Sequence, residues 1–564
     1  MRAPWVTALL ASPGALLGVR AASNQTGYDY IVVGGGPSGI ISAERLSAAN
    51  KKVLLLERST VGPTIETGAT KYTLEWNDTL TAIDVPGLSF DVGNLPQWTD
   101  YMCTDTDGTA ACILGGGVTV NYMVFVHPPD HDFNDQWPVG WEWADVAAGA
   151  ERLYARNPGS SVPSADRQLY DQSLYSTLAS FFDNLNWTAV DMSAQRNQKF
   201  QTYSHPVWNV QDYKRAGPLR TYLPLALGRK NFSLRMGALV TRVLRAGSRA
   251  TGVEIVNTAT NATETIRLAP GGRVILAAGA LHSPRILINS GIGPRAQIAT
   301  AQKSGIAVPP VHEWINLPVG KSLMDHPIFS IVIKTENGTF NTLDAAAILN
   351  GTATRDIAAY EQDNDGVLTQ GKHRLVFFTS NVASDGRTRF YQGSCTPTAE
   401  GVVTITAYMT HGLTSKGELA LDADQRTTIT KSPYLQTAAD REAATLFIQS
   451  MVDAITAPGS GMQLVEPYTN TSAILGSLTA GIHYAGTTKM GTHDGRFGNG
   501  TAVVDTNTKV YGMQNLYIVD GGIHPDLASG NNQAMIMVVA ENAVERIHQQ
   551  DSFLGEGMAT PYGA

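Results

Sequence analysis

Glycines and an acid at fixed spacing near the N-terminus could bind a dinucleotide. Gly34-Gly35-Gly36-Pro37-Ser38-Gly39 follows an apolar run, and Glu57 ends a second apolar run. Gly34 would permit a tight turn, Gly36 would let the backbone approach a pyrophosphate, and Gly39 would let a helix pack on a strand. An acid about 20 residues beyond such a turn is placed to hydrogen-bond a ribose hydroxyl. The spacing therefore predicts strand, helix and strand, with the N-terminal N–H groups of the helix facing phosphates.

Further apolar runs predict the elements that must position these residues. Residues 273–280 and 516–520 have the pattern of buried strands, whereas strand-like alternation dominates much of 326–482. Because nucleotide-type strands lie near both ends, we predict an α/β fold, a Rossmann-like dinucleotide-binding domain with an inserted, sheet-based α+β substrate domain. The predicted parts are 28–325, mostly nucleotide-binding but with about 145–217 contributing to the substrate side, 326–482 as the substrate domain, and 483–550 as the return to the first domain.

Length and charge exclude several classes of function. The chain has 564 residues, 43% of them hydrophobic and 16% charged, as expected for a globular protein with more than one domain. Its formal net charge of −8 leaves no basic excess for neutralising nucleic acid phosphates. No apolar run long enough to cross a membrane follows the N-terminal segment. We therefore expect neither a nucleic acid partner nor a membrane span.

The N-terminus has the features of a secretory signal peptide. From Met1 to about Ala22, Arg2 gives a positive start, residues 3–17 are mostly apolar, and Val19-Arg20-Ala21 resembles a cleavage site. N-glycosylation patterns recur along the chain, and they support a secreted, extracellular glycoprotein over an intracellular protein with accidental patterns. Their acceptors are Asn24, Asn77, Asn186, Asn231, Asn261, Asn337, Asn350, Asn470 and Asn499.

The chain has only three cysteines, too few for a disulfide scaffold. Cys103 and Cys112 are close in sequence on either side of a turn-like segment. In an oxidising compartment they could form a local disulfide bond. Cys395 would then be left over, and a buried thiol is a better interpretation than a nucleophile.

Several motifs together resemble the glucose-methanol-choline (GMC) oxidoreductase family. They are Val33 through Gly39, Gly115-Gly116-Gly117-Val118-Thr119-Val120-Asn121, Asp325-His326-Pro327, His483, Val519-Asp520-Gly521-Gly522 and Gly530-Asn531. Within the family, the segments Cys103 to Asn121 and Lys214 to Pro218 are most similar to the flavin domain of fungal cellobiose dehydrogenase. The resemblance implies the GMC fold and FAD as cofactor.

The resemblance also assigns residues to parts of a non-covalently bound FAD. Gly34, Gly36, Pro37, Ser38 and Gly39 would hold the pyrophosphate, and Glu57 the ribose of the adenosine. The remaining contacts would be Val240 to the adenine, Gly117 and Asn121 to the isoalloxazine, and Asp520 and Gly521 to the ribityl chain. No metal site is expected.

Alcohol oxidation requires the loss of a hydroxyl proton and of a hydride. The resemblance implies that His483 accepts the proton. A neutral imidazole suits this task because its reference pKa of about 6.5 is close to working pH. A lone histidine among small and apolar residues would more often be a core residue, so the surrounding motifs carry the interpretation. The second catalytic position is Asn531, which we favour over the adjacent Asn532.

The chain departs from cellobiose dehydrogenase near the expected substrate site. Ile482 and Tyr484 replace an asparagine and a tryptophan, and Lys416 stands where the relative has a sugar-contacting arginine. We therefore predict an FAD-dependent enzyme that oxidises the CH–OH group of a small molecule, with a carbohydrate as the first candidate. The alternatives are an aromatic or polyketide alcohol of fungal secondary metabolism, and a flavin-binding protein without redox activity. Electrons would pass to a diffusing acceptor such as oxygen, a quinone or an external redox protein, because no cytochrome domain is expected before Tyr28.

Overall fold

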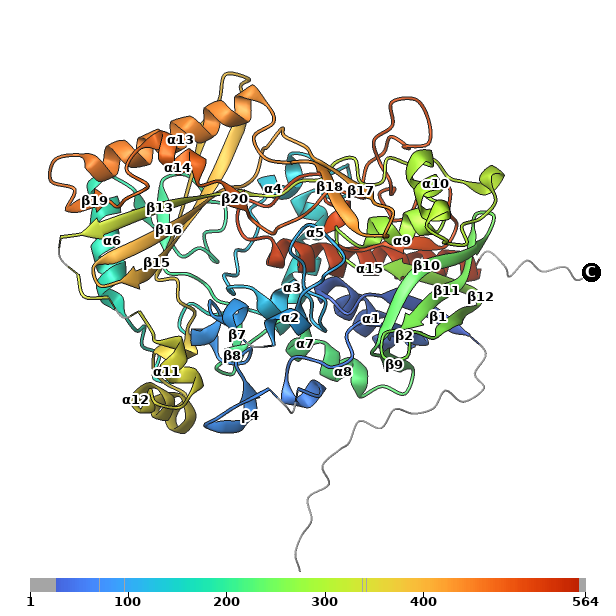
Figure 1. The fold of residues 1–564 in the computed structure, drawn as a ribbon, viewed down its shortest axis with the longest axis horizontal. Coiled ribbons are helices and arrows are strands. Elements are labelled where there is room, and N and C mark those ends of the chain that lie inside the picture. Colours follow the sequence, from blue (N-terminus) through green and yellow to red (C-terminus); the bar gives the residue numbers. More distant parts are fainter. Residues whose placement is uncertain (1–26, 70–71, 96, 337, 341, 557–564) are drawn as a thin grey trace, which may run out of the picture.

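Two β-sheets organise the molecule, each accompanied by its own helices (Figure 1). The computed structural model describes residues 27–69, 72–95, 97–336, 338–340 and 342–556. The predicted signal peptide, Asn24 and Asn337 lie outside this range. Strands from both ends of the chain meet in the first sheet, on the right of Figure 1, whereas the second sheet lies on the left.

The core of the first sheet is parallel, with strand order β9-β2-β1-β12-β21. The N-terminal half of β12 pairs in antiparallel fashion with β11, which pairs with β10. The bounds are β1 (Tyr28–Val33), β2 (Val53–Leu56), β9 (Phe232–Arg235), β10 (Ala238–Ala246), β11 (Arg249–Asn257), β12 (Thr263–Leu276) and β21 (Leu516–Ile518). All four residues of β2 are buried, as expected for a parallel strand covered on both faces. The strands predicted near both ends of the chain thus share one sheet.

Helices α1 (Pro37–Ala48) and α15 (Gln533–Glu556) pack against each other beside this sheet (Figure 1). Ile40, Ile41 and Leu46 of α1 are fully buried in the same core as the strands. Further helices around this half are α5 (Trp143–Arg156), α7 (Pro218–Thr221), α8 (Leu223–Leu227), α9 (Ser283–Asn289) and α10 (Arg295–Lys303). The arrangement of strand, glycine turn, helix and strand is the one that the first motif predicts.

The second sheet has strand order β19-β13-β16-β15-β14-β6-β5, with β20 also pairing β13. Its strands are β5 (Thr188–Ala189), β6 (Thr202–Ser204), β13 (Pro327–Thr335), β14 (Leu375–Val382), β15 (Thr388–Ala399), β16 (Val402–Met409), β19 (Met462–Leu464) and β20 (Thr479–Ala480). The helices packed with it are α6 (Gln172–Asn184), α13 (Ala438–Thr456) and α14 (Thr471–Gly476). The α/β fold class with an inserted sheet is therefore confirmed.

Short hairpins and helices complete the described part of the fold. Three hairpins pair β3 (Thr73–Leu74) with β4 (Asn77–Thr81), β7 (Val210–Gln211) with β8 (Lys214–Arg215), and β17 (Glu418–Leu421) with β18 (Thr427–Lys431). The short helices are α2 (Trp98–Tyr101), α3 (Gly117–Val120), α4 (His131–Asn134), α11 (Ala345–Leu349) and α12 (Thr354–Ala358). Among the helices that the structure describes, none is both long and apolar enough to cross a bilayer.

Candidate active site

A cavity of about 580 Å³ takes its lining from both sheets. It contains nearly all the residues that the sequence assigns to cofactor and catalysis. These are Gly34, Gly36, Pro37, Ser38, Glu57, Gly117, Asn121, Val240, His483, Asp520, Gly521 and Asn531. Gly39 is the predicted site residue that the lining does not include. Segments from opposite ends of the chain thus meet around one cavity.

The first glycine turn lines the cavity at the N-terminus of α1. Gly34 has a φ of +104°, a conformation that favours glycine. Gly36 is the N-cap of α1 and no side chain caps its N–H groups, so these remain available to an anion. A Cβ on Gly39 would lie 1.9 Å from the carbonyl oxygen of Gly34. Gly39 is therefore required for close packing behind the turn, and it does not itself face the cavity.

A second glycine turn packs directly on the first. The N–H of Gly115 donates to the carbonyl of Gly35 at 2.7 Å. Gly117 begins α3 and lines the cavity. Asn121 follows α3, and its side-chain oxygen accepts hydrogen bonds from the N–H of Met123 at 3.0 Å and from Arg215 at 3.1 Å. Arg215, which the sequence marked only as part of the segment Lys214 to Pro218, holds the side chain of Asn121 in place.

Acidic side chains fix the ends of two parallel strands at the cavity. Glu57, after β2, accepts from the N–H groups of Gly35 and Ser59, both at 2.8 Å. Asp520, after β21, accepts from the N–H of Gly279 at 2.9 Å and from the hydroxyl of Ser283 at 2.6 Å. Each carboxylate oxygen can accept more than one hydrogen bond, so Glu57 can also bind a ribose hydroxyl.

The cavity wall fits an elongated dinucleotide. Positions Gly36, Gly117 and Gly279 all line it, and a Cβ built on any of them would meet no protein atom closer than 4.0 Å. Glycine at these positions therefore leaves room for a ligand, whereas at Gly39 it relieves a clash between protein atoms. With a free helix N-terminus for a pyrophosphate and Glu57 for a ribose, the described residues suit FAD.

His483 lies in the turn after β20, with its side chain open to the cavity. Its Nδ1 is 2.9 Å from Nδ1 of His326, and its Nε2 is 3.4 Å from the side-chain nitrogen of Asn531. Burial lowers the pKa of His483 to about 4. Burial and the neighbouring His483 lower the pKa of His326 well below its usual value. Both imidazoles are therefore neutral at physiological pH.

Asp325 holds the backbone of the turn that carries His483. Its carboxylate accepts from the N–H groups of His483 at 2.6 Å, Ile482 at 3.1 Å and His326 at 2.9 Å, and from the hydroxyl of Tyr434 at 2.6 Å. Burial raises the pKa of Asp325 to about 6 against these hydrogen bonds, and it is ionised at neutral pH. The sequence marked Asp325 and His326 only as part of a motif, and the structure places both directly behind His483.

Asn531 is held by a side chain from the second sheet. Gln392 of β15 donates to the side-chain oxygen of Asn531 at 2.7 Å and accepts from its backbone N–H at 3.0 Å. This clamp turns the side-chain NH₂ of Asn531 toward His483, and among the described residues Asn532 makes no hydrogen bond to that histidine. No local sequence signal marks Gln392, because it lies 139 residues before Asn531 in the chain.

A buried histidine secures the segment before Asn531. The carboxylate of Asp132 accepts from the N–H of Ser529 at 2.9 and 3.0 Å, and His411 lies 3.7 Å from Asp132. Burial lowers the pKa of His411, but the surrounding carboxylates, led by Asp526, outweigh burial and raise the pKa to about 10. His411 is therefore a structural cation.

Aromatic and apolar side chains form the cavity wall around the histidine. Tyr408, Ile328 and Ile482 line the cavity. Tyr122 also lines it and is stacked on Phe90 with ring centroids 4.0 Å apart. The ring of Tyr408 lies 5.9 Å from that of His483. This part of the cavity offers a flat, largely apolar surface to a substrate.

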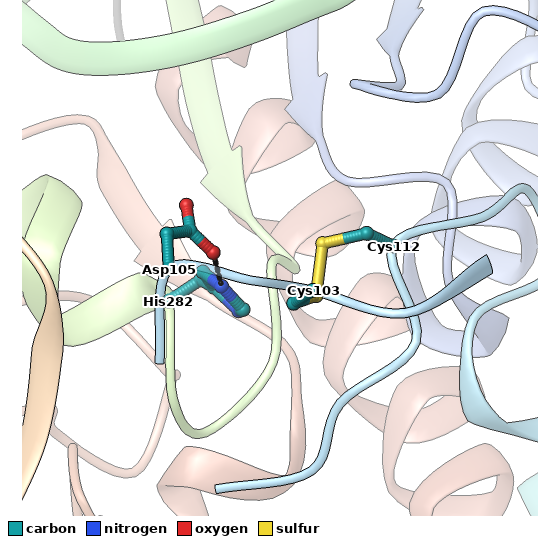
Figure 2. Close-up of side chains that lie close together, drawn as sticks. All are labelled: Cys103, Asp105, Cys112 and His282. Atoms are coloured by element: carbon teal, nitrogen blue, oxygen red, sulfur yellow. Dashed lines mark hydrogen bonds and ion pairs between the residues drawn. A yellow bond between two sulfur atoms is a disulfide. The ribbon is translucent and has the colours of Figure 1, made fainter. Parts of the chain in front are cut away.

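Cys103 and Cys112 form a disulfide bond with an S–S distance of 2.05 Å, so the local bridge that the sequence left open is present (Figure 2). Cys112 lines the cavity, whereas Cys395 is a buried free thiol. Asp105 and His282 place potential metal ligands within 4.8 Å of the two sulfur atoms. Because both sulfurs are bonded to each other, the pair does not provide thiolate ligands in this state.

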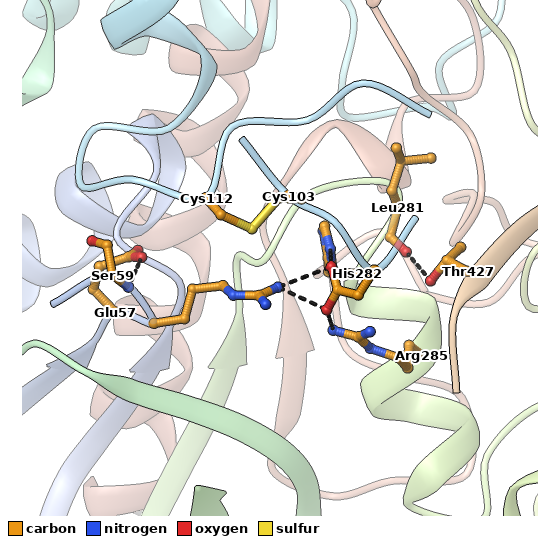
Figure 3. Close-up of a disulfide and its surroundings, with 10 residues drawn as sticks. Glu57, Ser59, Cys103, Cys112, Leu281, His282, Arg285 and Thr427 are labelled. Atoms are coloured by element: carbon orange, nitrogen blue, oxygen red, sulfur yellow. Dashed lines mark hydrogen bonds and ion pairs between the residues drawn. A yellow bond between two sulfur atoms is a disulfide. The ribbon is translucent and has the colours of Figure 1, made fainter. Parts of the chain in front are cut away.

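His282 and Arg285 belong to an ion-pair cluster beside the disulfide (Figure 3). The centre of this cluster is Asp105. Arg58 lies 3.0 Å, Arg285 2.7 Å and His282 3.2 Å from its carboxylate. Burial raises the pKa of Asp105. The hydrogen bond from His282 and the charges of Arg285 and Arg58 outweigh burial and hold this pKa below its usual range. The cluster joins the segment after β2 to α9 and the disulfide loop, which positions that part of the wall.

Lys416 is not among the described residues that line this cavity. It lines a second cavity instead, where its ammonium contacts the sulfur of Met324. The sequence-based expectation that Lys416 replaces a sugar-contacting arginine at the substrate site is therefore not matched by its position. The local sequence does not reveal which cavity the Lys416 side chain faces.

Comparisons with known proteins agree with this geometry. The N- and C-terminal domain models of the family described as GMC oxidoreductase match residues 28–328 and 414–540. The chain is 27% identical to mitochondrial choline dehydrogenase of Homo sapiens over 607 residues, covering 96% of both chains. It is 26% identical to chloroplastic fatty acid photodecarboxylase of Chlamydomonas reinhardtii over 603 residues, covering 95% of this chain and 93% of that one. The structure of formate oxidase from Aspergillus oryzae, solved in a study of its FAD modification, has the same fold, with a TM-score of 0.73, 19% identity and coverage of 94% and 100%.

Proposed function

Because this chain belongs to the GMC oxidoreductase family and is an FAD-dependent oxidoreductase, we propose that it oxidises an alcohol, with His483 accepting the hydroxyl proton. The observation that carries the proposal is a neutral imidazole in the cavity wall beside the amide of Asn531. FAD supplies the acceptor for the hydride, which leaves the carbon that carries the hydroxyl group. The residues of the chain orient the alcohol and move its proton.

The hydrogen bond between the two histidines sets which nitrogen is free. If Nδ1 of His483 carries the proton and donates to Nδ1 of His326, then Nε2 of His483 is the unprotonated nitrogen. That nitrogen faces Asn531, whose NH₂ group can donate to the oxygen of a bound alcohol. One side chain thus accepts the proton while the other steadies the developing negative charge on oxygen. Asp325 and Gln392 keep both groups in place.

Two substrate classes remain, and the cavity wall favours one of them. The resemblance to cellobiose dehydrogenase supports a carbohydrate. The cavity wall instead supports an aromatic or similarly apolar alcohol, because it contains Ile328, Ile482 and the stacked ring of Tyr122. A sugar hydroxyl that leaves water loses its hydrogen bonds, and aliphatic side chains offer none in return. We propose the apolar, aromatic alcohol as the better candidate.

A panel of alcohols tests the proposal. Under anaerobic conditions, benzylic alcohols should bleach the flavin faster than cellobiose or glucose do. Repeating the panel with oxygen and with a quinone or dye would identify which diffusing acceptor the enzyme uses. Faster bleaching by a sugar would favour the carbohydrate candidate, and bleaching by no alcohol would favour a flavin-binding protein without this redox activity.

We also propose that the protein is secreted and glycosylated. The side chains of Asn186, Asn261, Asn350 and Asn499 are exposed, which suits glycan attachment. Asn231 is a poor acceptor by contrast, because its amide donates to the carbonyls of Ser47 and Lys51. Intact mass before and after enzymatic deglycosylation of protein from a eukaryotic host should reveal glycans at the exposed sites. An unchanged mass would contradict the proposal.

A further inference from the structure

A second cavity, of about 240 Å³, lies outside the flavin site. Arg387, Lys416 and Lys489 all line it, and we call it the cationic pocket. None of its described lining residues also lines the flavin cavity. Met324, which immediately precedes Asp325, forms part of its wall. The cationic pocket is therefore a separate space, close in sequence to the residues behind His483 but not part of the substrate chamber.

The three cationic side chains have no carboxylate partner among the described residues. No ion pair joins Arg387, Lys416 or Lys489 to an acid in the described part of the chain, although most of its partly buried arginines have one. Arg387 itself is exposed, whereas the two lysines are not. The hydrogen bond that the Lys416 ammonium makes is to the sulfur of Met324, which is a weak acceptor. Lys416 and Lys489 are both partly buried, so water can satisfy them only in part.

The acids nearest to the pocket are already engaged elsewhere. Asp526 lines the pocket, but its carboxylate accepts from the N–H of Leu527 at 2.8 Å and lies 3.8 Å from the cationic His411. Asp440 is paired with the buried Arg389 at 3.0 Å and accepts from the N–H of Ser415 at 2.7 Å. Three positive charges therefore face the cavity against one carboxylate that is itself shared with another cation.

Mutual repulsion and burial both act on the lysines. Burial and the charge of Lys416 lower the pKa of Lys489. Burial and the charge of Arg387 lower the pKa of Lys416, although Asp526 and Asp440 act in the opposite direction. Placing like charges around a partly buried space costs free energy unless an opposite charge joins them.

We propose that the cationic pocket binds the oxyanion group of a small molecule, a phosphate or a carboxylate. Such a group would bring the missing negative charge and accept charge-assisted hydrogen bonds from Lys416, Lys489 and the guanidinium of Arg387. The volume suits a free phosphate or a small organic acid or phosphate ester, and it is below the range of drug-sized ligand sites.

Binding of inorganic phosphate to the FAD-loaded protein tests this site without any measurement of turnover. Calorimetric titration and thermal unfolding at constant ionic strength, with chloride as the reference anion, should both give a saturable signal. Lys416→Gln and Lys489→Gln should each weaken phosphate binding by about 10- to 100-fold, the loss expected for one charge-assisted hydrogen bond. Lys334→Gln, at an exposed position on β13, is the matched control and should bind as the wild type does.

Two further arms identify the source of the anion and guard against misfolded variants. Tighter binding of glycerol phosphate or citrate than of phosphate would indicate an organic ligand, whereas equal binding would indicate the free anion. Crystals of the FAD-loaded wild type soaked in selenate should show anomalous signal between Lys416 and Lys489. The proposal is overturned if the wild type shows no saturable binding of any of these anions, or if a double variant that combines Lys416→Gln and Lys489→Gln binds phosphate as tightly as the control.

Discussion

Replacing His483 by alanine should leave FAD bound but slow the reduction of the flavin by alcohol by about 10²–10⁴-fold. The side chain projects into the cavity and its removal leaves the backbone hydrogen bond of residue 483 to Asp325 intact. The turn should therefore keep its shape while the proton acceptor is lost. Anaerobic stopped-flow absorbance would measure the rate with the best alcohol of the panel.

His493→Ala provides the matched control for this variant. His493 is exposed and does not line the flavin cavity, so its removal should change neither the spectrum nor the rate. Reduction of His483→Ala at close to the wild-type rate would show that another group accepts the proton. Loss of the bound flavin spectrum would instead show that His483 is needed for assembly of the site.

Gly36→Val should fold and yet fail to bind FAD. Gly36 has φ −74° and ψ −178°, a conformation open to any residue, and a Cβ there would approach no protein atom closer than 4.0 Å. The valine side chain would instead occupy the cavity at the N-terminus of α1, where a pyrophosphate would lie. The ratio of flavin absorbance to protein absorbance after purification would measure FAD loading.

Gly476→Val is the control for the change itself. Gly476 ends α14, and a Cβ at this position would also meet no atom within 4 Å, but it lies outside the cavity. Circular dichroism should show that both variants are folded, and only Gly36→Val should be colourless. A Gly36→Val protein with normal flavin absorbance would refute the placement of the pyrophosphate beside Gly36.

The parallel sheet and its cofactor motif could be predicted from local sequence. The apolar runs of β1 and β2, the glycines between them and Glu57 lie within about 30 residues, as in any dinucleotide-binding unit of this kind. Family membership, the α/β fold and FAD are confirmed. The short strands β5 and β6 were not predicted, because two or three residues carry no periodic signal. They are strands because β6 pairs with β14 and β5 pairs with β6.

The positions of side chains around His483 depended on the tertiary structure. The resemblance paired His483 with Asn531, but only the folded chain shows that His326 hydrogen-bonds the imidazole and that Gln392 holds Asn531 beside it. The same applies to Lys416, which faces the cationic pocket and not the substrate chamber. Backbone turns and buried strands follow from short-range sterics and hydrophobic periodicity, so the sequence by itself determined them. Which side chains meet across the two sheets is set by long-range packing, and only the tertiary structure decided it.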